Sequence, residues 1–228
     1  MQKNKVLVCF LQDVSGSMDD NGRSPQKWAE TASGFRVFVD SLKADPDVEY
    51  LLSLTLFNTV ADNRFVAQPL RTIDSNYMSW VKPQGGTALY DSLGETIQRN
   101  EVAAGLVDKV IYVVVTDGEE NASRTWTKET LHSVVDGKLN GGKTTFQYLG
   151  AQPETWDEAA KIGIVAGSTV KYDVNNVVGA YAAFSEGINN FSKSAELSCR
   201  NITHSYTSAD TLRNSGLEFD TTAKVDQP

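Results

Sequence analysis

The stretch VLVCFLQDVSGSM at residues 6–18 decides the fold, because an apolar run passes directly into a polar loop. Residues 6–11 are continuously apolar and contain strand-forming side chains, which predicts a strand that is buried on both faces. Strands of this kind are typical of the middle of a parallel sheet that is covered by helices. The polar residues that begin with Asp13 are therefore expected at the carboxyl end of a central strand.

Outward from this stretch, apolar runs alternate with helical patterns. The runs predict further strands at residues 48–58, 64–69, 109–115, 144–149 and 169–172. Helical spacing of apolar residues predicts helices at 25–44, 88–104, 128–139, 155–161 and 177–197. Ser24 is the expected N-cap of the first helix, with Pro25 at its first position.

This alternation predicts an α/β fold with a doubly wound, mostly parallel central sheet and helices on both faces. Residues 48–58 and 64–69 are separated by a polar turn at 59–63, as in a hairpin. The hairpin adds one antiparallel edge strand to the predicted sheet. The resulting architecture is Rossmann-like.

Length and charge narrow the classes of function. The chain has 228 residues, with 21 Lys and Arg against 29 Asp and Glu, and a formal net charge of −8. We expect one domain over residues 1–198 and a polar, flexible tail over 199–228. The absence of a dense basic stripe argues against binding to nucleic acid or to an anionic membrane. The sequence shows neither a signal peptide nor a membrane-spanning run, which predicts a cytoplasmic protein.

Polar side chains follow two of the predicted strands and precede one predicted helix. Asp13, Ser15 and Ser17 alternate after the first strand, Asp117 follows the strand at 109–115, and Thr87 ends a GGT loop. Each group alone is ordinary turn or cap chemistry. Ligands of open α/β sheets, however, bind beyond the carboxyl ends of the strands, and Mg²⁺ prefers carboxylate and hydroxyl oxygens. Together the groups predict a cation site.

These three segments, in this order and context, resemble the metal-ion-dependent adhesion site of von Willebrand factor type A domains. The resemblance covers about residues 5–195. It implies that Ser15, Ser17 and Thr87 supply hydroxyls to Mg²⁺, with Asp13 and Asp117 bound directly or through water. Mn²⁺ or Ca²⁺ are the alternative ions.

The resemblance also implies a function. An open position on the metal would bind an Asp or Glu carboxylate of a partner protein, so that the chain is a metal-dependent protein-interaction module and not an enzyme. Stand-alone bacterial and phage members of the family suggest an AAA+ ATPase or an assembly complex as the partner.

Other acids lie close to these residues in the sequence. We expect most of them to form a solvated rim that concentrates cations; the acids are Asp19, Asp20, Asp91, Glu119 and Glu120. Asp91 lies one helical turn beyond Thr87, so it can also reach a residue that holds the metal.

Several other interpretations compete with this one. Residues 137–144 match the P-loop pattern, but a helix is predicted before them and a strand after them, the reverse of the order that a P-loop needs. Ser15 and Ser17 lack the GxSxG context of a nucleophile, and neither His132 nor His204 is an obvious base. Two alternatives remain open: a scaffold protein with a mainly structural metal, and a metal-dependent hydrolase.

Overall fold

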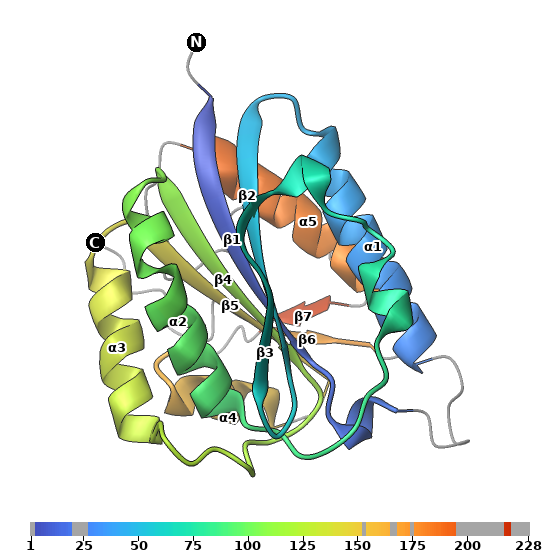
Figure 1. Ribbon diagram of the computed structural model, residues 1–228, viewed down its shortest axis with the longest axis vertical. Coiled ribbons are helices and arrows are strands. Elements are labelled where there is room, and N and C mark those ends of the chain that lie inside the picture. Colours follow the sequence, from blue (N-terminus) through green and yellow to red (C-terminus); the bar gives the residue numbers. More distant parts are fainter. Residues whose placement is uncertain are drawn as a thin grey trace.

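In the part of the chain that the structure describes, seven strands form one sheet, with helices against both of its faces (Figure 1). The computed structural model describes residues 3–19, 27–151, 154–164, 168–173, 176–194 and 217–219. The strand order is β3-β2-β1-β4-β5-β6-β7. The strands are β1 (Asn4–Asp13), β2 (Val48–Phe57), β3 (Ala61–Pro69), β4 (Lys109–Thr116), β5 (Thr144–Gly150), β6 (Thr169–Tyr172) and β7 (Leu217–Phe219).

Each face of the sheet has its own apolar core. Helices α1 (Lys27–Ala44) and α5 (Val177–Lys193) cover one face, and their buried side chains pack on every second residue of β1. Helices α2 (Leu89–Gly105), α3 (Lys128–Asn140) and α4 (Thr155–Lys161) cover the other face and pack on the alternate residues. The continuously apolar β1 is buried because both of its faces are covered. None of the described helices has both the length and the apolar character needed to cross a membrane.

The predicted α/β class and the mostly parallel sheet are confirmed. The bounds of α4 and β6 agree with prediction, and β2 and β3 pair in antiparallel orientation as a hairpin. Helix α5 is shorter than predicted, because Ser194 adopts an extended conformation and ends it. The predicted cap and first residue of α1, Ser24 and Pro25, lie outside the described residues.

The predicted antiparallel edge strand is β3, and the other edge of the sheet carries a second antiparallel strand that was not predicted. Strand β7 pairs with β6, with Val170 opposite Phe219. Its three residues lie in the region predicted as a polar tail, and a run of this length is too short to show periodicity. Leu217 is nevertheless buried against the core. The division of the chain at residue 198 stays a prediction.

Close packing between α1 and α5 reaches the end of the central strand. Gly34 in α1 faces the ring of Tyr181 in α5, and a Cβ atom at residue 34 would lie 2.8 Å from Tyr181 Cδ2. The hydroxyl of Tyr181 donates a hydrogen bond of 2.8 Å to Gln12 Oε1, while Gln12 Nε2 donates to the Asp13 carbonyl at 3.0 Å. The absence of a side chain at Gly34 thus lets Tyr181 bind the strand just before Asp13.

We expect Gly34→Ala to lower the free energy of unfolding by about 1–3 kcal/mol, because the new methyl group overpacks against the ring of Tyr181. Gly137→Ala is the matched control, since residue 137 is also helical but a Cβ there meets nothing within 4 Å. The control should gain about 0.5–1 kcal/mol from helix propensity. Urea denaturation of the variants measures both effects, and equal stability of the two would contradict this packing.

Candidate metal centre

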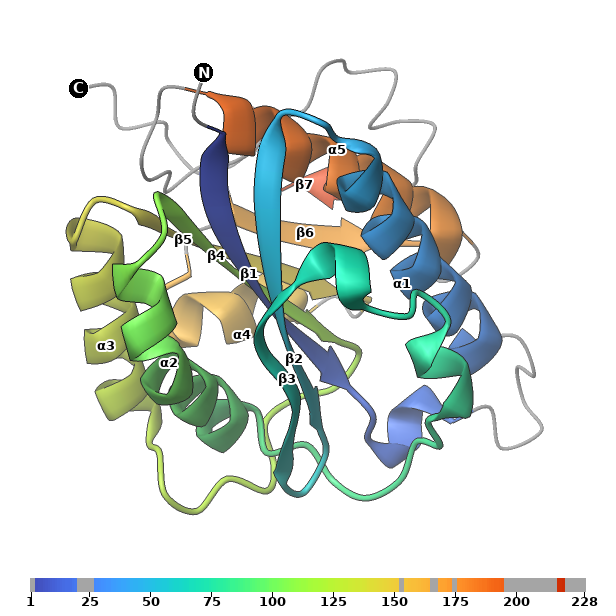
Figure 2. The same cartoon turned by 45° about the horizontal axis from the view of Figure 1, so that its top comes forward.

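The predicted site residues lie where the strand order reverses. From β1 the chain builds one half of the sheet through β2 and β3, and from β4 it builds the other half. The point between β1 and β4 is where open α/β sheets bind ligands. Three segments meet at the carboxyl ends of these strands (Figures 1 and 2): the turn η1 (Gly16–Met18), the loop after β4 and the loop before α2.

Backbone hydrogen bonds join these three loops. Gly16 N donates to the Gly85 carbonyl at 2.9 Å, and Asn121 N donates to the Thr87 carbonyl at 3.0 Å. Gly85 has a φ of +83°, which glycine adopts without strain, and this places its carbonyl toward η1. In addition, the side-chain oxygen of Asn121 accepts a hydrogen bond of 2.8 Å from Thr87 N. Asn121 therefore positions Thr87, a role that the sequence did not reveal.

Four of the five predicted ligand residues form one continuous hydrogen-bonded chain. Asp13 Oδ1 accepts from Ser15 N at 2.7 Å, and the hydroxyls of Ser15 and Ser17 lie 2.9 Å apart. The Ser17 hydroxyl then donates to Asp117 Oδ1 at 2.7 Å. Asp13, Ser15 and Asp117 are buried, whereas Ser17 is exposed, so the cluster opens to solvent on the side of Ser17.

The fifth residue, Thr87, joins the cluster beside Gly118. A Cβ atom at residue 118 would lie 3.3 Å from Thr87 Oγ1, 3.6 Å from Ser17 Oγ and 3.9 Å from Asp13 Oδ2. Oxygens from two segments, the end of β1 with η1 and the loop before α2, thus converge next to the backbone of the third loop. A side chain at residue 118 would crowd this space.

Asp13 is the most deeply buried acid of the cluster. Burial raises the pKa of its carboxyl to about 6, against hydrogen bonds from Thr116 and Ser15 that lower it, and the charge of Asp117 raises it further. The Thr116 hydroxyl donates to Asp13 Oδ2 at 2.6 Å. A second carboxylate beside a buried one is costly unless a cation compensates the charge.

The side chain of Lys27 supplies a cation to this cluster. Its ammonium group donates to the Ser17 carbonyl at 2.7 Å and forms a short ion pair with Asp117 Oδ2. The side chain of Asp117 is only 2% exposed and that of Lys27 is 20% exposed, so the pair is largely shielded from water. A positive charge thus already lies among the oxygens that were predicted to bind a metal.

Sequence reasoning did not identify Lys27 as part of the site. One signal was present, since a lysine in the first turn of a helix is unfavourable for the helix dipole. Lys27 begins the described part of α1, and its ion pair with Asp117 gives this positive charge a partner.

The donor set fits a hard divalent cation. Its side-chain donors are two carboxylates and three hydroxyls, all oxygen, which suits Mg²⁺ or Mn²⁺ better than softer ions. Within the described ranges, no group of three or more His, Cys, Asp and Glu side chains is close enough to hold a metal. A metal at this site would therefore depend on the serine and threonine hydroxyls.

Two acids expected in a solvated rim instead hold a loop together. Glu120 Oε2 accepts from Tyr90 N at 2.9 Å, and its Oε1 accepts from Ala122 N and Ser123 N at 2.8 and 2.7 Å. Asp91 accepts backbone hydrogen bonds of 2.8, 2.9 and 2.7 Å; the donors are Arg124, Thr125 and Trp126. Both carboxylates attach residues 118–127 to the first turn of α2.

Asp91 thus acts on the site through the loop that carries Asn121. Of the other predicted rim acids, Asp19 and Glu119 are exposed and Asp20 lies outside the described residues.

The competing interpretations gain no geometric support. Residues 137–144 form the end of α3 and the start of β5, at the amino ends of the parallel strands and so opposite the predicted metal site. Lys143 Nζ donates to the Val107 carbonyl at 3.1 Å. His132 lies on α3 with Nδ1 3.3 Å from the Lys161 carbonyl oxygen, away from Ser15 and Ser17. His204 lies outside the described residues.

Burial alone would raise the pKa of the Asp91 carboxyl, but the backbone N–H groups of Trp126, Arg124 and Thr125 lower it below its ordinary value. Because the folded pKa is the lower one, the carboxylate stabilises the fold above the unfolded pKa of about 3.9 and loses this effect as the pH falls. We expect Asp91→Asn to lower the free energy of unfolding by about 0.5–1.5 kcal/mol at pH 7, after allowance for solvent screening.

The loss of stability caused by Asp91→Asn should become smaller as the pH falls below about 4. Denaturation at several pH values measures this dependence. Glu95→Gln is the control, because Glu95 lies one turn further along α2 and accepts no hydrogen bond within the described part of the chain. A cost that does not change with pH would exclude this role for Asp91.

No protein-family model matches the sequence, and no curated protein matches it. Solved structures do match. One is proximal thread matrix protein 1 from the mussel byssus, with a TM-score of 0.62 and 18% identity over 80% of this chain and 46% of that one. A von Willebrand factor type A protein from Catenulispora acidiphila aligns with a TM-score of 0.57 and 17% identity, over 80% of this chain and 42% of that one.

The manganese-loaded TRAP protein of Plasmodium vivax aligns with a TM-score of 0.55 and 18% identity, over 77% of this chain and 71% of that one. The chain thus spans less than half the length of the mussel and Catenulispora structures. Identities this low speak for the fold alone. With its strand order and the helices on both faces, the chain has the fold of von Willebrand factor type A domains.

Proposed function

We propose that this chain is a protein-interaction module that uses a divalent cation, Mg²⁺ in the first place, to bind an acidic side chain of a partner protein. The residues that would hold the ion are Asp13, Ser15, Ser17, Thr87 and Asp117. The observation that carries the proposal is the convergence of oxygens of Asp13, Ser17 and Thr87 beside Gly118, with Ser15 and Asp117 hydrogen-bonded to Ser17 and the ammonium of Lys27 on Asp117.

Two structural neighbours support a divalent ion at such a site. The mussel thread protein has also been solved with zinc in its metal-ion-dependent adhesion site, and the TRAP protein with manganese. Neither of these two structures indicates which divalent ion this chain would bind. The oxygen-only donor set favours Mg²⁺, with Mn²⁺ as a close substitute and Ca²⁺ as a larger one.

The shape of the cluster supports a role in binding rather than in catalysis. It is closed toward the sheet by the buried Asp13 and Thr116, and it opens to solvent beside Ser17. When bound, the cation supplies positive charge and a coordination position on this open side. Without it, the carboxylates of Asp13 and Asp117 would repel an acidic partner.

Lys27 weighs against a metal whose role is mainly structural. Its ammonium compensates the charge of Asp117 and donates to the Ser17 carbonyl, so the buried carboxylate of Asp117 has a cation beside it without a metal ion. We infer that the divalent ion exchanges with this ammonium instead of supporting the fold. The structural neighbours give no support for an AAA+ ATPase as the partner.

Isothermal titration with Mn²⁺ and Mg²⁺ tests the site. We expect Asp13→Asn or Thr87→Ala to weaken binding of the ion by about 100-fold, since each removes a ligand. Glu119→Gln is the matched control and should bind the ion almost as the parent protein does, because Glu119 is an exposed neighbour outside the ligand set.

A partner captured from cells in Mg²⁺ should be lost both in EDTA and by the Asp13→Asn variant. Capture that persists in EDTA, together with a large fall in thermal stability, would favour the scaffold with a structural metal.

Replacement of Lys27 by methionine should separate the effect of this side chain on stability from its effect on the affinity for the ion. In EDTA, Lys27→Met should lower the free energy of unfolding by about 1–3 kcal/mol, because Asp117 is left without its cation. The same variant should bind Mn²⁺ about tenfold more tightly, the equivalent of about 1.4 kcal/mol, since the ion no longer displaces an ammonium. Unchanged affinity in a folded Lys27→Met variant would show that Lys27 does not compete with the ion.

A further inference from the structure

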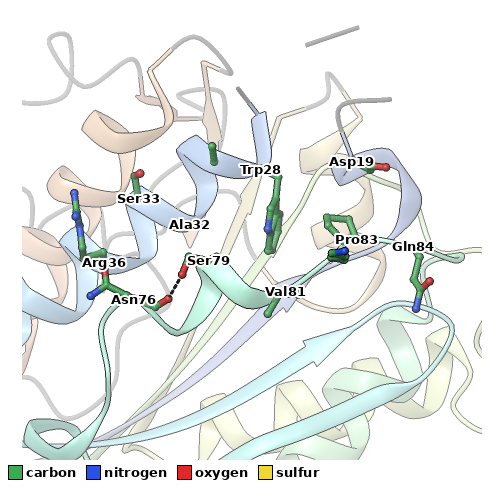
Figure 3. A pocket seen from close by; sticks show the side chains of 12 residues that line it. Asp19, Trp28, Ala32, Ser33, Arg36, Asn76, Ser79, Val81, Pro83 and Gln84 are labelled. Carbon is green, nitrogen blue, oxygen red and sulfur yellow. Dashed lines mark hydrogen bonds between the residues drawn. The ribbon is translucent and has the colours of Figure 1, made fainter. Parts of the chain in front are cut away.

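A pocket of about 790 Å³ lies between α1 and residues 76–84, beside the candidate metal centre (Figure 3). Its middle is apolar, where the indole of Trp28 extends from α1 toward Val81 and Pro83. Asp19 and Gln84 lie at one end of the pocket, and Arg36 lies at the other. The function proposed above makes no use of this pocket.

One end of the pocket is continuous with the loops of the metal centre. Asp19 follows the predicted ligand Ser17 by two residues and accompanies Gln84 in the lining of the pocket. Gln84 N donates to the Val14 carbonyl at 2.8 Å. Trp28 directly follows Lys27, whose ammonium contacts Asp117. A chain bound at the metal would therefore enter the pocket at the Asp19 end.

The pocket carries positive charge in an acidic protein. Arg36 and Lys82 are exposed in its lining, and neither forms an ion pair with any residue that the structure describes. Among the described residues that line the pocket, Asp19 is the only acid against the two cations Arg36 and Lys82, although the whole chain has a net charge of −8. This local excess favours an anionic ligand.

A buried polar atom in the lining lacks a partner. Nε1 of Trp28 is buried, and no residue among the described ranges accepts a hydrogen bond from it. Because this N–H is closed to solvent, it offers no donor to a ligand in the pocket. Trp28 thus offers a bound chain an apolar surface.

We propose that this pocket binds the segment of the partner that flanks its metal-bound acid. The partner segment would be an extended peptide with one acid at the metal, an apolar side chain against Trp28 and Pro83, and a second acid at Arg36. This inference rests on the proposed function and names the chemistry of its partner. Asp19 adds specificity, because it disfavours an acid near the pocket entrance except at the metal itself.

A defined set of fluorescein-labelled peptides tests the proposal. In each peptide an aspartate is followed at increasing spacing by a leucine and then by a glutamate, and matched peptides replace the glutamate by glutamine or the leucine by glycine. Fluorescence anisotropy in Mn²⁺ and in EDTA measures binding. Tryptophan emission gives a second readout, because a peptide in the pocket should change the signal of the parent protein but not that of Trp28→Phe.

We expect the two-acid peptides of one spacing to bind best, and Arg36→Gln to weaken them about three- to tenfold. Arg36→Gln should not affect the glutamine peptide, which lacks the second acid. Arg99→Gln is the matched control: it removes an exposed arginine from α2, which packs on the opposite face of the sheet.

The two proposals fail in different ways. Binding that needs Mn²⁺ but is unaffected by Arg36→Gln, or no binding by any peptide, would overturn the assignment of the pocket. Binding that depends on Arg36 equally in Mn²⁺ and in EDTA would support the pocket and overturn the role of the metal. Titration of Mn²⁺ alone separates these cases further, since Arg36→Gln should leave the affinity for the ion unchanged.

Discussion

The organisation of this protein depends on two carboxylates held close together at the end of its central strands. Asp13 ends β1 and Asp117 follows β4, and the topology places both at the point where the strand order reverses. Burial makes their charges costly, so a cation is required between the loops. The serine hydroxyls, the backbone of Gly118 and the ammonium of Lys27 are all arranged around this requirement.

The strength of the apolar pattern determined how much of the fold could be predicted. The run at the start of β1 and the alternation after it were sufficient for the α/β class, because a fully buried strand leaves little choice of residues. Strand β7 was missed since its three residues carry no period, and its place is set by pairing with β6. Element ends also moved by a few residues, as at Ser194, where backbone conformation rather than composition ends α5.

Some residues of the candidate site could be predicted from the sequence, and others could not. Asp13, Ser15 and Ser17 were identifiable because their spacing is local, and Asp117 and Thr87 because a strand end and a glycine loop mark them. Lys27, Asn121 and the loop-holding roles of Asp91 and Glu120 depend on contacts between distant segments. No local pattern distinguishes such an acid from one on a solvated surface, so these roles required the structure.

The ammonium of Lys27 is tethered to the chain, and this affects how the site would sense its surroundings. A tethered group has an effective concentration that dilution of the protein does not change. The threshold of divalent ion needed to occupy the cluster would then be set within the molecule, by the reach of one side chain from the start of α1. Dilution of the protein would leave this threshold unchanged, whereas monovalent salt, which screens the two carboxylates, would raise it.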